Sequence, residues 1–139
     1  MNIHEYQAKS IFHDSGIKVV KGIHCLTVED ALNAYEELES KVVAVKSQIH
    51  AGGRGKGNLY NPESGELVME GGVKIAFSKE EVREYSTAII GNRLVTKQTG
   101  KEGKIVESCI LGIPSNSNPE CDLCGLIKGA LPFTLIIII

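Results

Sequence analysis

The chain has 139 residues, 42% of them hydrophobic, which suffices for one small domain with a core but not for a large multidomain enzyme. With 15 basic and 17 acidic residues the formal net charge is -2, so charge gives no reason to propose nucleic acid or an anionic membrane as a partner. The sequence shows no secretory signal and no apolar run of the roughly 18 residues that cross a bilayer, so a cytoplasmic protein with reduced thiols is expected.

Two helices are predicted in the first 40 residues. Apolar residues within 6–12 are spaced partly three and four positions apart, and Gly16 supplies the left-handed conformation that commonly ends a helix. Thr27 starts a capping box, in which its hydroxyl can accept a hydrogen bond from the amide three residues later. Apolar residues then follow at helical spacing: Ala31, Ala34, Tyr35 and Leu38.

The stretch 42–46 predicts a central strand, because it is β-branched and almost wholly apolar, and it ends on Lys46. Alternating and capped patterns further on predict a strand, a helix begun by Ser78 and ended near Gly91, and two more strands. These elements favour an α/β or α+β fold with a mixed sheet flanked by helices. The later elements are expected at residues 73–77, 78–90, 93–96 and 104–107.

A glycine-rich loop follows the strand at 42–46. Residues 46–57 contain four glycines and two further cations after Lys46. Glycine lets backbone N–H groups approach an anion, while lysine and arginine neutralise its charge, so the composition suits a polyphosphate site. The segment is neither a P-loop nor a G-x-G-x-x-G turn that opens a helix. A solvated flexible loop is the alternative, and chemistry alone does not decide between the two.

The four histidines suggest no catalytic or metal-binding role. His50 lies beside the loop and is interpreted as a structural hydrogen-bonding residue. Cys121 and Cys124 could form half of a zinc site, but no second pair lies at suitable spacing. The other histidines are isolated from metal-type ligands and are expected to be surface residues or to have hydrogen-bond partners: His4, His13 and His24.

Four segments in the same order resemble the β subunits of succinyl-CoA synthetase, which belong to the ATP-grasp family. They are Met-Asn-Ile-His-Glu-Tyr-Gln-Ala-Lys from residue 1, the loop at 46–56, Gly-Gly-Val-Lys at 71–74, and the stretch at 91–99. The loop is similar to that of malate-CoA ligase β subunits and of the start of ATP-citrate lyase. The segment at 57–70 resembles an insertion, with turn residues at its centre.

The resemblance implies a role for five residues. Lys46 would contact the nucleotide phosphates, Gly53, Arg54 and Gly55 would form a small loop closing over them, and Glu107 would meet the ribose or base. The implied ligand is ATP or ADP, or GTP or GDP, with Mg²⁺ in the complete family. No catalytic residue and no metal ligand is predicted in this chain.

The family's reaction interconverts succinyl-CoA, ADP and phosphate with succinate, CoA and ATP in the tricarboxylic acid cycle, with a histidine on a partner α subunit carrying the phosphoryl group. Its members are cytoplasmic in bacteria or lie in the mitochondrial matrix. The resemblance thus implies an ATP-grasp N-terminal subdomain of a succinate-CoA ligase β subunit, incomplete by itself and inactive alone. The alternatives are a non-catalytic gene remnant, a fragment that only pairs with the α subunit, or a malate-CoA ligase β subunit.

Composition changes near residue 107, because only Glu120, Asp122 and Lys128 carry charge after Glu107. The sequence therefore predicts an ATP-grasp subdomain at 1–107 and a non-family tail at 108–139 that is disordered or aberrant. The family pattern continues differently from this point and would carry the Mg²⁺ ligands, so a frameshift or premature end near residue 107 is expected.

Overall fold

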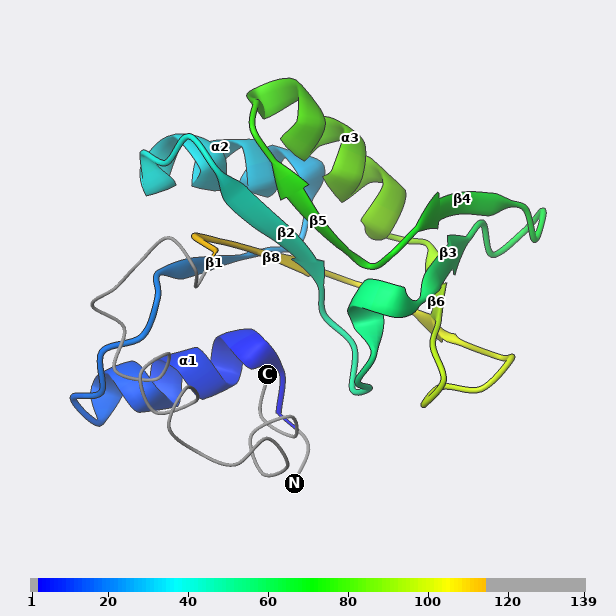
Figure 1. Cartoon of the computed structure of the whole chain (residues 1–139), viewed down its shortest axis with the longest axis horizontal. Coiled ribbons are helices and arrows are strands. Elements are labelled where there is room, and N and C mark those ends of the chain that lie inside the picture. Colours follow the sequence, from blue (N-terminus) through cyan, green and yellow to red (C-terminus); the bar gives the residue numbers. More distant parts are fainter. Residues whose placement is uncertain (1–2, 115–139) are drawn as a thin grey trace.

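The computed structural model describes residues 3–114, which form three α-helices and two four-stranded sheets (Figure 1). Every strand pairing in this part of the chain is antiparallel. The expected α+β class is confirmed, but the mixed sheet expected from the sequence is replaced by two antiparallel sheets. The first sheet has the order β1 (Gly22–Cys25), β8 (Cys109–Gly112), β2 (Val43–Ser47) and β5 (Val73–Ala76).

The second sheet is smaller and follows the loop that the sequence analysis identified. Its order is β4 (Leu67–Glu70), β3 (Asn58–Tyr60), β6 (Arg93–Val95) and β7 (Lys104–Ile105). The strands predicted at 93–96 and 104–107 are β6 and β7. The segment at 57–70 forms the β3–β4 hairpin, and Leu59 in the middle of β3 is fully buried. Strand β3 therefore contributes to the core, while most of residues 61–70 are exposed.

Helices α2 (Val28–Leu38) and α3 (Lys79–Ile89) pack against each other on one face of the first sheet (Figure 1). Both begin where the sequence predicted. The Thr27 hydroxyl accepts from the Asp30 amide at 3.0 Å, and the Asp30 carboxylate accepts from the Thr27 amide at 2.9 Å, which completes the capping box. Each helix buries one apolar face, with Leu32 and Ile89 among the largest buried side chains.

Helix α1 (Glu5–Asp14) lies on the side of the first sheet opposite α2 and α3, next to β1 (Figure 1). Gly16 adopts φ +77° just after the helix, and the Ile17 amide bonds the Phe12 carbonyl at 2.9 Å. The left-handed stop predicted at Gly16 is confirmed. Glu5 and Ala8 are the buried residues of α1, so a charged side chain faces the protein interior.

The folded unit continues beyond residue 107. Cys109 pairs with Cys25 on one side and with Ser47 on the other, so β8 joins β1 to β2 within the first sheet. The boundary expected at 107 therefore falls between two strands of one unit. Within residues 109–112 the lack of charge has a simple cause, because β8 is buried along its whole length. The predictions for residues 115–139, including the zinc half-site, concern residues outside those that the structure describes.

Within residues 3–114, no helix is long and apolar enough to cross a membrane.

Candidate functional site

The end of strand β2 delivers Lys46 to the glycine-rich loop. The strand is buried along most of its length, as predicted, but the Lys46 side chain is 27% exposed. Gly53 adopts φ +74°, which an L side chain rarely does, and a short 3₁₀ turn, η1 (Arg54–Lys56), follows it. The loop then enters β3. The structure thus places Lys46 at the start and Gly53 at the turn of one continuous loop.

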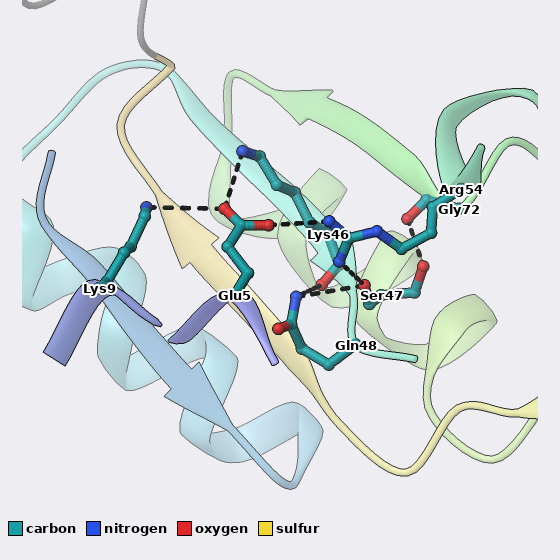
Figure 2. Close-up of polar contacts among 7 residues, drawn as sticks. All are labelled: Glu5, Lys9, Lys46, Ser47, Gln48, Arg54 and Gly72. Atoms are coloured by element: carbon teal, nitrogen blue, oxygen red, sulfur yellow. Dashed lines mark hydrogen bonds and ion pairs between the residues drawn. The ribbon is translucent and has the colours of Figure 1, made fainter. Parts of the chain in front are cut away.

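A buried carboxylate joins the two cations predicted to bind phosphate (Figure 2). Glu5 Oε1 lies 3.1 Å from Lys46 Nζ, and Glu5 Oε2 lies 3.0 Å from Arg54 Nη2. The Lys9 ammonium is a third neighbour, 3.7 Å from Oε1. Only 3% of the Glu5 side chain is exposed. Burial alone would raise the pKa of Glu5, but the charges of Lys46, Lys9 and Arg54 hold this pKa below its ordinary value.

Arg54 turns its guanidinium inward. In addition to the Glu5 contact, Arg54 Nη1 donates to the Ser47 carbonyl at 2.7 Å, and the side chain is only 10% exposed (Figure 2). The backbone of the same residue is also anchored, because the Arg54 carbonyl accepts from the Gly72 amide at 2.8 Å. Gly72 in turn accepts from the Ser47 amide and hydroxyl, at 2.9 and 2.7 Å. The Arg54 side chain therefore fixes the loop directly to β2, and the Arg54 backbone fixes it to Gly72, which is itself bonded to β2.

The loop also carries amide groups that have no hydrogen-bond partner among residues 3–114. The Lys56 amide bonds the Gly53 carbonyl and the Gly57 amide bonds the Arg54 carbonyl, so these carbonyls are used within the turn. In the part of the chain that the structure describes, the amides of Gly53, Arg54 and Gly55 donate no hydrogen bond. Successive unpaired amides of this kind can bind an anion.

Glu107 lies near the same cluster but does not contact it directly. It is exposed in the link between β7 and β8, and its charge acts on His4, the residue before Glu5. The next residue, Ser108, accepts at its carbonyl from the Gln48 amide at 3.0 Å, which fixes this link beside the loop. The predicted residues Lys46 and Arg54 are thus joined through Glu5, while Glu107 stands to one side.

Four rings stack beside the cluster, in the order His50, His4, Tyr6 and His24. The centroids of His50 and His4 are 3.8 Å apart, those of His4 and Tyr6 are 5.8 Å apart, and those of Tyr6 and His24 are 3.7 Å apart. Burial, followed by the charges of His50, His24 and Arg54, lowers the pKa of His4, and burial likewise lowers that of His24.

The stack changes the interpretation of these histidines. His50 contacts His4 by ring stacking, so it has a structural place, as predicted, through a different contact from the one expected. His24 was expected to be exposed or hydrogen-bonded, yet its Nε2 is buried and has no partner among the described residues. The lowered pKa values of His4 and His24 favour neutral imidazole at these two positions.

A polar cavity of about 340 Å³ borders the loop. Gly55 and Lys56 line it from the loop, and Glu70 and Lys74 line it from β4 and β5. Lys56 and Lys74 place two positive charges beside this cavity, and Glu70 places one negative charge there.

Metal binding finds no support in residues 3–114, where no three His, Cys, Asp or Glu side chains are grouped so that they could hold an ion.

Sequence reasoning missed three residues of this site: Glu5, Ser47 and Gly72. Glu5 reaches Lys46 and Arg54 across sequence separations of 41 and 49 residues, which no local pattern reveals. The available signal was the segment at 1–9 that carries part of the family resemblance, where a charged residue falls on the buried face of a helix.

Comparison with known proteins places these residues in a family. The family model described as "ATP-grasp domain" matches residues 2–128. The chain is 50% identical over 120 residues to the "Succinate--CoA ligase [ADP-forming] subunit beta" of Campylobacter fetus, an alignment that covers 86% of this chain and 28% of that protein. It is 48% identical over 130 residues to the protein of the same name from Hyphomonas neptunium, covering 94% of this chain and 32% of that protein.

A third relative of that name, from Exiguobacterium sibiricum, is 46% identical over 111 residues, covering 80% of this chain and 25% of the relative. The chain thus spans between 25% and 32% of the length of these relatives. The family match and the 130-residue alignment both run past residue 107. Similarity therefore continues beyond the compositional change at which it was expected to stop.

Proposed function

Because the chain belongs to the ATP-grasp domain family, we propose that residues 3–114 form one wall of a nucleotide site. Lys46 and the amides of residues 53–55 would bind the phosphates, and Glu107 would lie towards the ribose or base. One observation carries the proposal: the exposed part of Lys46 and three unpaired amides of the described chain belong to the same anchored loop. Such an arrangement suits an anion with several oxygens.

The proposal also covers the activity of the complete protein to which this part of a nucleotide site would belong. Similarity to proteins named as ADP-forming succinate-CoA ligase β subunits supports a role in interconverting succinyl-CoA, ADP and phosphate with succinate, CoA and ATP. That name favours succinate over malate and ADP over GDP. An α subunit would be the protein partner, and a location in the bacterial cytoplasm belongs to the same proposal.

The described residues would bind and orient the nucleotide, and none of them is assigned a bond-breaking step. When bound, Mg²⁺ would supply charge neutralisation for phosphoryl transfer. By the family resemblance, its protein ligands would come from a part of the family pattern beyond residue 107.

A second candidate is a non-catalytic protein that pairs with an α subunit without binding nucleotide. Exposed apolar side chains, among them Phe77 at 64% and Ile75 at 41% on or next to the edge strand β5, are the observation in its favour. Nucleotide binding discriminates between the two candidates.

The test is titration calorimetry of the full chain with ADP, together with thermal unfolding at rising ADP concentration. A ligand held by the native state stabilises it by about 2.7 kcal/mol at a concentration of 100 Kd. Lys46→Met should raise Kd at least about tenfold, because it removes a charge-assisted contact. Lys41→Met, at an exposed lysine outside the cluster, should leave Kd unchanged. No heat of binding and no thermal shift at millimolar ADP would refute the proposal.

A further inference from the structure

We propose that Glu5 is a positioning residue of this site: its carboxylate holds Lys46 directly, and through Arg54 it holds the 53–55 loop in the arrangement that receives an anion. The role in binding rests on the proposed function. The role in holding the loop does not depend on it.

The first support is the direction of the Arg54 side chain. Its guanidinium uses Nη2 on Glu5 and Nη1 on the Ser47 carbonyl, and it is 10% exposed (Figure 2). A guanidinium that already donates to Glu5 and to the Ser47 carbonyl is poorly placed to bind a ligand at the surface. Arg54 therefore serves as the anchor of the loop, and phosphate recognition is left to backbone amides and to Lys46.

The second support is that Glu5 completes a closed set of contacts around the loop. Arg54 is held by Glu5 through its side chain and by Gly72 through its carbonyl. Ser47 bonds both the Arg54 guanidinium and the Gly72 carbonyl. With these contacts in place, the amides of residues 53–55 remain without a hydrogen-bond partner in the part of the chain that the structure describes. Removing the Glu5 carboxylate leaves the buried Arg54 guanidinium without one of its hydrogen-bond partners, which costs free energy.

The third support is the balance of charge. A single buried carboxylate meets three cations, Lys9, Lys46 and Arg54, so the cluster keeps a surplus of positive charge. If Glu5 acted only through its charge, its removal would make the cluster more positive and tighten anion binding. Positioning predicts the opposite result, and the sign of the change separates the two.

The experiment compares the wild-type chain with Glu5→Gln and with Glu37→Gln. Glu37→Gln removes the same charge from an exposed ion pair with Lys21. ADP affinity is measured by titration calorimetry at fixed salt. Amide hydrogen exchange without ligand is measured at Lys56, Gly57 and Gly72, whose amides bond loop carbonyls. The expected result for Glu5→Gln is a Kd raised about tenfold and exchange at these amides accelerated about tenfold. Glu37→Gln should change neither quantity.

A second variant guards against a folding defect in Glu5→Gln. Arg54→Lys keeps the charge but lacks the planar fork that reaches Glu5 and Ser47 together, so it should also accelerate exchange in the loop and raise Kd.

Unchanged or tighter ADP binding in both variants, or unchanged exchange in the loop, would overturn the positioning role. If the wild-type chain binds no ADP, the proposed function fails, and the exchange data alone decide whether Glu5 holds the loop.

Discussion

Glu5 on α1 and Lys46 on β2 lie 3.1 Å apart, and only 3% of the Glu5 side chain is exposed. A helix near one end of the chain is thereby joined to the strand that opens the loop. The carboxylate is ionised in this environment because three cations surround it, despite burial. This relationship links the folding of the chain to pH.

The first prediction is that Glu5 makes stability depend on pH in the acid range. Its pKa is lower in the folded chain than the ordinary value of 4.5, so its stabilising contribution is complete above about pH 4.5 and is lost as pH falls through the folded pKa. Urea unfolding of wild type and Glu5→Gln, followed from about pH 7 to pH 3, should show a difference in unfolding free energy that shrinks on acidification. A difference that stays constant over this range would contradict the prediction.

The second prediction concerns the cap of α2. Thr27→Ala removes the hydroxyl that accepts from the Asp30 amide at 3.0 Å, and should lower the unfolding free energy by about 1 kcal/mol. Thr87→Ala is the matched control, because that exposed hydroxyl bonds a carbonyl within α3 and caps no helix. Its effect should stay within about 0.5 kcal/mol. Equal losses in the two variants would mean that the cap has no special role.

The third prediction tests the close approach of Gly72 to its neighbours. A Cβ at this position would lie 2.6 Å from Ser47 Oγ and 2.8 Å from Leu94 Cδ2. Gly72→Ala should therefore cost about 1 to 3 kcal/mol, as overpacking of a tight site does. Gly55→Ala is the control for stability, because a Cβ there would meet nothing within 4 Å. Thermal or urea unfolding measures both, and a Gly72→Ala chain as stable as wild type would show that the approach can relax.

The fourth prediction concerns Cys25 and Cys109, which pair across β1 and β8 and are fully buried. The hydrogen bond with Cys25, together with burial, raises the pKa of the Cys109 thiol, so this thiol stays protonated and unreactive. Iodoacetamide followed by peptide mapping should label neither residue in the native chain and both in urea. Labelling of the native chain at the rate of a free thiol would contradict the buried arrangement.

The sequence was most informative where the signal is local. Thr27 and Ser78 begin helices through contacts three residues away, and the predicted α2 and α3 are found. Strands β1, β3, β4 and β8 were not predicted. Each has only three or four residues, too few to show a clear alternation, and β8 is buried at every position.

The candidate site likewise has a part that local sequence predicts and a part that depends on residues far apart in the chain. The loop was recognised because its glycines and cations are consecutive in sequence. The orientation of the Arg54 side chain towards the interior could not be predicted from the loop sequence, because it depends on the carboxylate of Glu5, 49 residues earlier. The exposed Arg54 that a loop composition suggests is in fact mostly buried.

The position of β8 bears on when the chain can fold. This strand is the last of the described ones to be synthesised, yet it lies between β1 and β2, with Gly112 opposite both Gly22 and Ala44. Until those residues have left the ribosome, β1 and β2 lack the neighbour that joins them, so the first sheet cannot close before β8 has been synthesised. Pairings this distant in sequence also slow folding, because a long loop must be ordered before they form. The nascent chain would thus expose its apolar strands until residue 112 has emerged, a period in which a chaperone could bind them.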